Sequence, residues 1–341
     1  MRAIIFEGPR QLSLREAPVP EPGAGEVVVR VAAALTCGTD LKAYKRGHRL
    51  FAPGMIFGHE FAGNISAVGA GVRRWREGDR VTAANSAPCN ACFYCRRGQH
   101  QLCEELEQRF NWGAFAEHIR VPAHIVAQNM YPLPGGLSFE HAGVIEPLAC
   151  AIHGVAVGQV QLGDSVVIIG AGAQSLMQVQ IARRMGAARV IVIGRSRGRL
   201  ERARTLGADA VLSVLDGDPL AFVREQTGQR GADVTLEAAG TADTWRMAFD
   251  ATRAGGTAVM FSGLPGGAEV GFDATRLHYG QISVKGSFHH TPRFVEMAWR
   301  MLADGHIDCA ALVDGEIALE DVETGLQRMD RGEVIKLAVR P

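Results

Sequence analysis

Four cysteines within one short segment constrain this chain more than any other feature. Cys89, Cys92, Cys95 and Cys103 lie in the stretch CNACFYCRRGQHQLC. Two residues between each of the first three thiols let one turn present three sulfurs to a common point, and the chain then returns Cys103 at roughly 2.3 Å from a bound zinc ion. Four thiolates leave no open coordination position. The spacing therefore predicts a structural zinc site; the alternatives are unrelated free thiols or disulfides.

Length and charge indicate an enzyme-sized protein without a polyelectrolyte or membrane partner. The 341 residues correspond to about two domains, and 36 basic side chains balance 36 acidic ones. The amino terminus MRAIIFEGPRQLSLREAPVP lacks the apolar segment and cleavage site of a signal peptide. No window approaches 18 uninterrupted apolar residues. We expect a cytoplasmic protein whose partner is a small molecule, with no nucleic acid and no membrane surface.

The predicted secondary-structure pattern changes about halfway along the chain. Residues 1 to about 150 contain short runs of β-branched residues bounded by Gly, Pro and Asp, such as EVVVRVAAAL (26–35) and DRVTA (79–83). A buried-strand pattern, DSVVIIG (164–170), then enters a glycine-rich turn and the helical pattern QSLMQVQIARRMG (174–186). This order predicts a β-rich first part followed by a βαβ unit.

The βαβ pattern continues toward the carboxyl terminus. Further strand candidates, with helical stretches between most of them, are ARVIVIG (188–194), ADAVLSV (208–214), ADVTLEAAG (232–240), GTAVMFSG (256–263) and ISVKGSF (282–288). Such alternation predicts a doubly wound parallel sheet. In the last segment, 289–341, one helix is predicted, over PRFVEMAWRMLADG.

The turn after the first of these strands has the pattern of a dinucleotide-binding loop. Gly170 permits a tight turn, and Gly172 lets backbone N–H groups approach a pyrophosphate at the positive end of the next helix. Ser175 stands where a third glycine usually is, and Gln174 and Leu176 flank it. An ordinary glycine turn is the alternative, but the strand before it and the helix after it favour the nucleotide reading.

Three upstream segments carry ligand types for a second, open metal site. Cys37 lies in ALTCGTD, His59 and Glu60 in FGHEFAG, and Glu146 in VIEPL. Thiolate, imidazole and carboxylate together hold catalytic zinc with an exchangeable position. Individually, a buried cysteine is more often a small core residue, and a lone histidine a hydrogen-bonded structural one.

Taken together, these motifs resemble the zinc-containing medium-chain dehydrogenase/reductase superfamily. GHEFAGNISAVGAGVRRWREGDRV (58–81) is similar to its zinc signature, and CGTD, the four-cysteine lobe and GAGAQS follow in the family's order. The resemblance implies an α/β fold in which a Rossmann doubly wound parallel sheet domain (151–288) is inserted in a β-rich GroES-like catalytic domain (1–150 and 289–341). The structural zinc lobe would span about 86–104, and the active site would lie in the cleft between the domains.

The same resemblance assigns the open metal site. It implies that Cys37, His59 and Glu146 approach a catalytic zinc, that Glu60 exchanges with water or substrate, and that each subunit holds two zinc ions. The polyol and sugar dehydrogenase branch has a glutamate where simple alcohol dehydrogenases tend to have a cysteine, and this chain has Glu146. A plain carboxylate at a helix start is the alternative for Glu146.

The resemblance also implies a proton exit beside the zinc. The metal would polarise a substrate hydroxyl, a hydride would pass to nicotinamide, and Thr39 would begin the proton relay. Asp40 would orient a ligand or the turn. Many relatives have a histidine five residues after the cysteine, whereas this chain has Lys42, which is a weaker proton shuttle or only a solvated charge.

The end of the second Rossmann strand bears on cofactor choice. NAD-selective enzymes of this branch have an acid there for the ribose hydroxyls, but this chain has Gly194, followed by Arg195 and Ser196. Charge-assisted hydrogen bonds from these residues would favour the 2′-phosphate of NADP over NAD, although a solvated helix start is the alternative. Arg197 and Arg199 are weaker phosphate candidates. The remaining cofactor contacts that we predict are Leu264 and Ser287.

The predicted activity is hydride transfer between a secondary alcohol and a nicotinamide cofactor. The alcohol would be a polyol, sugar or cyclitol, bound near Phe51, Asn111, Trp112 and His289. A threonine-type amino-alcohol dehydrogenase is the alternative enzyme, and a non-catalytic nucleotide-binding structural or sensor protein is the alternative of another class. We expect a homodimer or homotetramer. The sequence does not distinguish His48 from an ordinary core or surface histidine.

Overall fold

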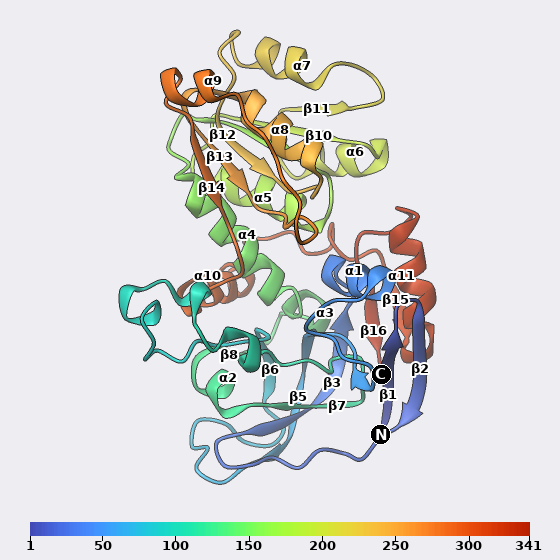
Figure 1. The fold of residues 1–341 in the computed structure, drawn as a ribbon. Helices are drawn as coiled ribbons and strands as arrows, with labels where there is room; N and C mark the ends of the chain where they lie inside the picture. The colour runs from blue at the N-terminus through green and yellow to red at the C-terminus, as the bar shows by residue number, and fades with distance from the viewer. The chain divides into compact units, whose positions relative to one another are not determined.

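Two units, each with its own β-sheet core, make up the chain in this computed structural model, which describes residues 1–341 (Figure 1). One unit comprises Met1–Ala149 and His290–Pro341, and the other Cys150–His289. Helix α4 (Ile145–Gly158) contains the first boundary between them. The mixed α/β architecture with an inserted parallel sheet is the predicted fold class.

The discontinuous unit is built mainly from antiparallel strands. Its larger sheet follows the order β15-β16-β3-β5-β6-β8, with β7 also paired to β3, and a smaller sheet has the order β2-β1-β4. Most residues of β3 are Val, Ala or Leu with buried side chains, because both faces of this strand are covered. The strands are β1 (Arg2–Gly8), β2 (Gln11–Glu16), β3 (Val27–Leu35), β4 (Met55–Ile56), β5 (Glu60–Val68), β6 (Arg80–Ala83), β7 (His118–Val121), β8 (Met130–Pro132), β15 (Glu316–Ala318) and β16 (Ala338–Arg340).

Helices and 3₁₀ turns connect these strands. They are α1 (Gly38–Arg46), α2 (Ala123–Gln128), α3 (Phe139–Ala142), α10 (Pro292–Ala303), α11 (Val322–Asp330) and the 3₁₀ turns η1 (Cys95–Arg97), η2 (His100–Leu102), η3 (Leu106–Arg109) and η4 (Leu319–Asp321). The prediction of one helix in the last segment was incomplete, because α11 follows α10. Gly325 weakens the helical signal of α11, and a Cβ there would lie 2.7 Å from Ile317 Cδ1, so a larger residue would displace that side chain.

The continuous unit has the predicted parallel sheet. Its strands run β11-β10-β9-β12-β13-β14, and every neighbouring pair is parallel, which is the doubly wound order of a dinucleotide-binding domain. Apolar residues such as Val167 and Ile191 form its core. The strands are β9 (Ser165–Ile169), β10 (Arg189–Gly194), β11 (Ala210–Ser213), β12 (Ala232–Glu237), β13 (Thr252–Met260) and β14 (Ser283–Gly286). The helices after α4 are α5 (Ala173–Arg184), α6 (Arg197–Thr205), α7 (Pro219–Gln226), α8 (Ala242–Ala251) and α9 (Ala274–Tyr279).

One stretch is long and apolar enough to cross a membrane by composition alone. It covers Phe139–Gly158, and 78% of its most apolar window is buried inside the protein. Burial of this kind is typical of a core helix, so the stretch is weak evidence for a membrane span.

Candidate active site and metal centres

Strand register brings three distant segments to one end of the larger sheet. Leu35 at the end of β3 pairs with Glu60 at the start of β5, and Ala338 of β16 also pairs with Leu35. Because both pairings are antiparallel, the residues just after β3, just before β5 and just before β16 meet at this end. The fold thereby collects Cys37, His59 and Lys336.

Three predicted ligands form a tight group at this point. The sulfur of Cys37, a ring nitrogen of His59 and a carboxylate oxygen of Glu60 lie within 4.8 Å of one another. His59 and Glu60 are buried, whereas Cys37 keeps partial exposure. A soft thiolate, an imidazole and a carboxylate at this spacing suit a zinc ion with an exchangeable position.

Asp40 fixes the orientation of two members of this group. Its Oδ1 lies 2.9 Å from His59 Nδ1, and its Oδ2 accepts the backbone N–H of Cys37 at 3.1 Å. With the proton held on Nδ1, the lone pair of Nε2 is available to a metal. Asp40 itself is fully buried on the first turn of α1, which fits the orienting role predicted for it.

Lys336 is the residue of this site that the sequence analysis missed. Its Nζ donates to Glu60 Oε2 at 2.5 Å and to the carbonyl oxygen of Thr36 at 2.8 Å, and both charged side chains are buried. Burial, the largest single effect, would lower the pKa of Lys336, but the anionic groups around it, Glu60 first and then Cys37 and Asp40, together raise it, so the ammonium persists. A lysine within the apolar run VIKLAV is a signal that could have identified it.

Two properties of the group show that it fits a cation. Glu60 Oε1 is buried and has no hydrogen-bond partner, so an acceptor remains available on the carboxylate. Burial raises the pKa of the Cys37 thiol, so a neighbouring cation is needed to hold this sulfur as a thiolate near neutral pH.

Glu146 and Thr39 lie near this group but outside it. Glu146 is in the first turn of α4 and is almost fully buried, so the helix-start alternative describes its position correctly. Burial raises the pKa of Glu60, and the charge of Glu146 adds to that rise, which places the two carboxyl groups near each other. Thr39 is half-buried in the first turn of α1. The roles of both residues stay predictions.

Aromatic side chains line one side of the group. The Trp112 ring lies edge-on to His59 at 5.4 Å, and Phe51 packs on Trp112 at 4.3 Å. Asn111 donates its backbone N–H to Asn85 O at 2.7 Å, and its side-chain Nδ2 is buried without a partner. Three of the four predicted substrate residues therefore adjoin the metal ligands or the wall beside them. The fourth, His289, belongs to the other unit, where its carbonyl oxygen lies 2.7 Å from His153 Nδ1.

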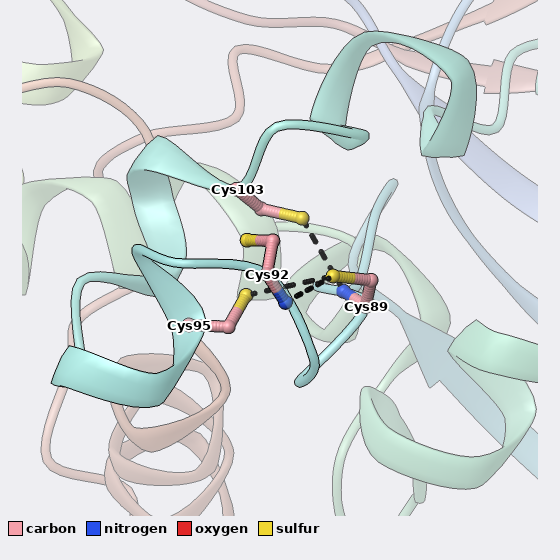
Figure 2. A group of neighbouring side chains, drawn as sticks. All are labelled: Cys89, Cys92, Cys95 and Cys103. Atoms are coloured by element: carbon pink, nitrogen blue, oxygen red, sulfur yellow. Dashed lines mark hydrogen bonds between the residues drawn. The ribbon is translucent and has the colours of Figure 1, made fainter.

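The four-cysteine lobe converges as the spacing predicts. Figure 2 shows the four sulfurs turned toward one another, and all lie within 4.8 Å. The Cys89 and Cys95 sulfurs are 3.9 Å apart, close to the roughly 3.8 Å that tetrahedral geometry gives for ligands 2.3 Å from zinc. All four are free cysteines, and backbone N–H groups point at sulfur, as from Cys89 to Cys103 at 3.3 Å. The lobe fits a closed structural zinc site.

Loss of this site should reduce stability more than it alters chemistry. Backbone hydrogen bonds lower the pKa of Cys92 to about 6, whereas burial raises that of Cys95 to about 12. Cys92→Ser removes the ligand that most readily ionises, so we expect the loss of about one zinc per chain and a thermal unfolding temperature lower by roughly 5 °C or more. Elemental analysis and calorimetry would test this. Full stability combined with lost turnover would contradict a structural role.

The glycine-rich turn after β9 is shaped to receive a phosphate group. Gly170 has φ +120°, and a Cβ there would lie 3.0 Å from the backbone of Ala238 and 3.1 Å from Ser175 Oγ, so only glycine fits. A Cβ on Gly172 would meet nothing within 4 Å, and no side chain caps α5 at that residue. Ser175 Oγ and Gln174 Oε1 are buried without partners. Open backbone donors at a helix start fit a pyrophosphate, while Leu176 is buried in the helix behind them.

The residues after β10 differ in how well they could bind the 2′-phosphate of NADP. Arg195 is exposed, and Ser196 is the N-cap of α6 without a side-chain capping bond. Arg197 instead pairs with Asp216 at 2.5 Å, which makes it the poorest phosphate candidate. Arg199 is half-buried. The other two predicted contacts are Leu264, half-buried after β13, and Ser287, whose N–H donates to Met260 O and whose Oγ is buried without a partner.

Comparison with known proteins agrees with this geometry. Family models described as "Alcohol dehydrogenase GroES-like domain" and "Zinc-binding dehydrogenase" match residues 23–134 and 175–304. Sorbitol dehydrogenase of Bacillus subtilis is 31% identical, with 100% of this chain and 97% of the relative covered. L-threonine 3-dehydrogenase of Bacillus velezensis is 32% identical, with 100% and 99% covered. A zinc-binding dehydrogenase from Sinorhizobium meliloti bound to NADP superposes with a TM-score of 0.91 at 30% identity, over 100% and 99% of the two chains. The chain therefore belongs to the zinc-binding alcohol dehydrogenase family.

Proposed function

We propose that this chain is a zinc-dependent dehydrogenase that interconverts a secondary alcohol of a polyol, sugar or cyclitol with its ketone, using NADP. The observation that carries the proposal is the group formed by Cys37, His59 and Glu60, with Asp40 orienting the imidazole. One buried carboxylate oxygen of Glu60 has no hydrogen-bond partner and so remains available to a cation. The polyol class rests on Glu146 and on similarity to sorbitol dehydrogenase.

In this proposal each side chain has a separate task. Zinc, when bound, polarises the substrate hydroxyl, and the nicotinamide supplies the hydride acceptor. Cys37, His59 and Glu146 would hold the metal, and Glu60, which bonds to the Lys336 ammonium, would be a further ligand that exchanges with substrate. Thr39, on the first turn of α1, begins the relay that carries the substrate proton away. Trp112 and Phe51 exclude water on one side of the reacting carbon.

An initial-rate screen of polyols, cyclitols, sugars and L-threonine, each with NADP and with NAD, tests this function. Threonine is the second candidate because threonine dehydrogenases match the whole chain at similar identity. A higher kcat/KM for threonine than for every polyol would favour that candidate. Turnover of no alcohol, in protein that binds both zinc and nucleotide, would favour a nucleotide-binding sensor.

The NADP preference is proposed from Gly194 and Arg195. A hydrogen bond to a charged group contributes about 1.5–3 kcal/mol, so Arg195→Ala should weaken NADP binding by roughly 10- to 100-fold and change NAD binding little. Arg197→Ala is the matched control, because that guanidinium pairs with Asp216. Cofactor fluorescence titration at one ionic strength measures both affinities. Equal effects of the two variants would remove Arg195 from the phosphate site.

Reversal of the preference needs a steric control. A Cβ on Gly194 would lie 2.9 Å from Ala171 Cβ and 3.2 Å from Leu200 Cδ2, so Gly194→Asp adds strain at the glycine-rich turn as well as charge. Gly194→Ala adds the same strain alone. The ratio of kcat/KM for NADP and NAD, compared between these two variants, isolates the repulsion between the carboxylate and the 2′-phosphate.

Three further features belong to the proposal. Two donor sets, Cys89/Cys92/Cys95/Cys103 and the group around Cys37, correspond to two zinc ions per subunit. A cytoplasmic location and a homodimer or homotetramer are the cellular and quaternary states that we propose. Elemental analysis and light scattering test the metal content and the assembly.

A further inference from the structure

Glu237 is a fully buried acid that the proposed mechanism does not use. It is the last residue of β12, it is 0% exposed, and it forms no ion pair. Its Oε1 accepts the backbone N–H groups of Ala239 at 2.8 Å and Gly240 at 2.6 Å, and the hydroxyl of Thr244 at 2.7 Å. Its Oε2 is buried and has no hydrogen-bond partner. A buried acid costs free energy unless donors or a cation stabilise it, and here only donors are present.

The surroundings of Glu237 favour its ionised form. All three partners of Oε1 are donors, and donors stabilise a carboxylate relative to the neutral acid. No Lys, Arg or His side chain bonds to it, so backbone dipoles and one hydroxyl alone balance the charge. This unit therefore contains a buried negative charge without a counter-ion.

Strand register places Glu237 beside the glycine-rich turn. Glu237 pairs with Ile169, the last residue of β9, and Gly170 follows Ile169 directly. The next residue, Ala238, donates its N–H to Ile169 O at 2.8 Å, and a Cβ on Gly170 would lie 3.0 Å from the Ala238 backbone. The turn that Glu237 organises, residues 238–240, therefore packs against the turn that is shaped to receive a phosphate group.

The strand order assigns the two halves of a dinucleotide to opposite sides of this point. The chain passes from β9 through β10 to β11 and then returns to β12 on the other side of β9, so the order reverses between β9 and β12. Dinucleotides bind across such a reversal, with one nucleotide over each half of the sheet. Because Gly194 and Arg195, the predicted contacts to the 2′-phosphate, follow β10, the adenosine belongs over β9–β11. The nicotinamide half then belongs over β12–β14, where Glu237 lies.

We propose that the buried charge of Glu237 stabilises the oxidised, cationic nicotinamide relative to the reduced, neutral one. This inference rests on the proposed function and specifies how the bound cofactor is tuned. Hydride transfer moves one proton and two electrons from the carbinol carbon to the nicotinamide ring and removes the positive charge of the ring, while the hydroxyl proton leaves separately. A nearby anion attracts the cationic ring and not the neutral one. The carboxylate therefore lowers the reduction potential of the bound couple, by about 30 mV for a tenfold effect on relative affinity.

Separate dissociation constants for NADP⁺ and NADPH test this inference in the zinc-loaded protein. Glu237→Gln keeps the shape and an acceptor oxygen but removes the charge, so NADP⁺ should bind about tenfold more weakly, which is the effect of a unit charge about 10 Å away in a protein interior. The affinity for NADPH should change by less than about twofold. Fluorescence titration measures NADPH directly and NADP⁺ by competition, and the same comparison uses NAD⁺ and NADH if these bind more tightly.

Two control variants separate charge from structure. Thr244→Ala removes one bond to Oε1 but keeps the carboxylate, so its effects on NADP⁺ and NADPH should be equal. Asp233→Asn removes an acid from the opposite end of β12, about 13 Å along the strand, where Asp233 pairs with Arg253 at 2.6 Å. This variant should leave the ratio of the two affinities unchanged.

The outcomes distinguish this inference from the proposed function. Equal losses of NADP⁺ and NADPH affinity in Glu237→Gln, with alcohol oxidation retained, would assign Glu237 a structural role and overturn only the charge effect. Glu237→Met is a second neutral variant, and its affinity ratio should shift in the same direction. If neither neutral variant folded while Thr244→Ala and Asp233→Asn did, Glu237 would be required for the fold and the inference would fail. Wild-type protein that binds neither nucleotide would overturn the dehydrogenase proposal as well.

Discussion

Replacement of Cys37 by alanine is expected to lower kcat by about a thousandfold or more while nucleotide affinity stays within about twofold. Loss of a metal's Lewis acidity removes several kcal/mol of transition-state stabilisation, and about 4 kcal/mol corresponds to a thousandfold in rate. The nucleotide should still bind, because the glycine-rich turn at Gly170 and Gly172 belongs to the other unit. Single-turnover rates and cofactor fluorescence titration measure the two quantities separately.

Cys309→Ala provides the matched control for the loss of a thiol. Cys309 is buried in the same unit, its pKa is raised to about 12 by burial, and it belongs to none of the metal-ligand groups. This control should cost some stability and little activity. Glu146→Gln, assayed beside it, tests the remaining proposed ligand. If Cys37→Ala kept the turnover and the zinc content of the wild type, the group at the end of β3 would not be the catalytic centre.

Local sequence signals predicted the elements that depend on near neighbours. The strand, glycine turn and helix around Gly170 could be recognised because each has its own periodicity and the three are contiguous. The four-cysteine lobe was equally local. The structure has these elements where they were expected, with α5 at Ala173–Arg184 and β10 at Arg189–Gly194.

Long-range strand pairing was the part that sequence patterns could not supply. Cys37 and His59 were first connected by family resemblance, and their proximity depends on the pairing of Leu35 with Glu60. Lys336 was missed because β16 pairs with β3 across some three hundred residues, and no local pattern specifies that partner. A lysine within the apolar run VIKLAV, just before β16, is the only local trace of the ion pair at Glu60.

Breaking the buried Lys336–Glu60 pair should reduce the free energy of unfolding much more than breaking an exposed pair of similar length. Lys336→Met leaves the Glu60 carboxylate buried without its ammonium partner, and removal of one partner of a buried pair costs about 3–5 kcal/mol. For a domain of about 200 residues this corresponds to roughly 2–4 °C per kcal/mol, so the unfolding temperature of the zinc-loaded protein should fall by about 10 °C. Lys45→Met, which breaks the exposed 2.6 Å pair with Asp330, should cost no more than about 1 kcal/mol.

A double-mutant cycle separates the charge effect from lost packing. Glu60→Gln in the Lys336→Met background removes the stranded charge, so it should restore part of the stability, whereas Lys336→Arg should keep most of it. The effect on activity should differ from the effect on stability. Without the ammonium, Glu60 has only the metal as a cationic partner and should compete with the substrate for it. We therefore expect a higher KM for the alcohol. Equal unfolding temperatures for Lys336→Met and Lys45→Met would show that the buried ammonium does not balance Glu60, and the proposed exchange of Glu60 at the metal would then lose its physical basis.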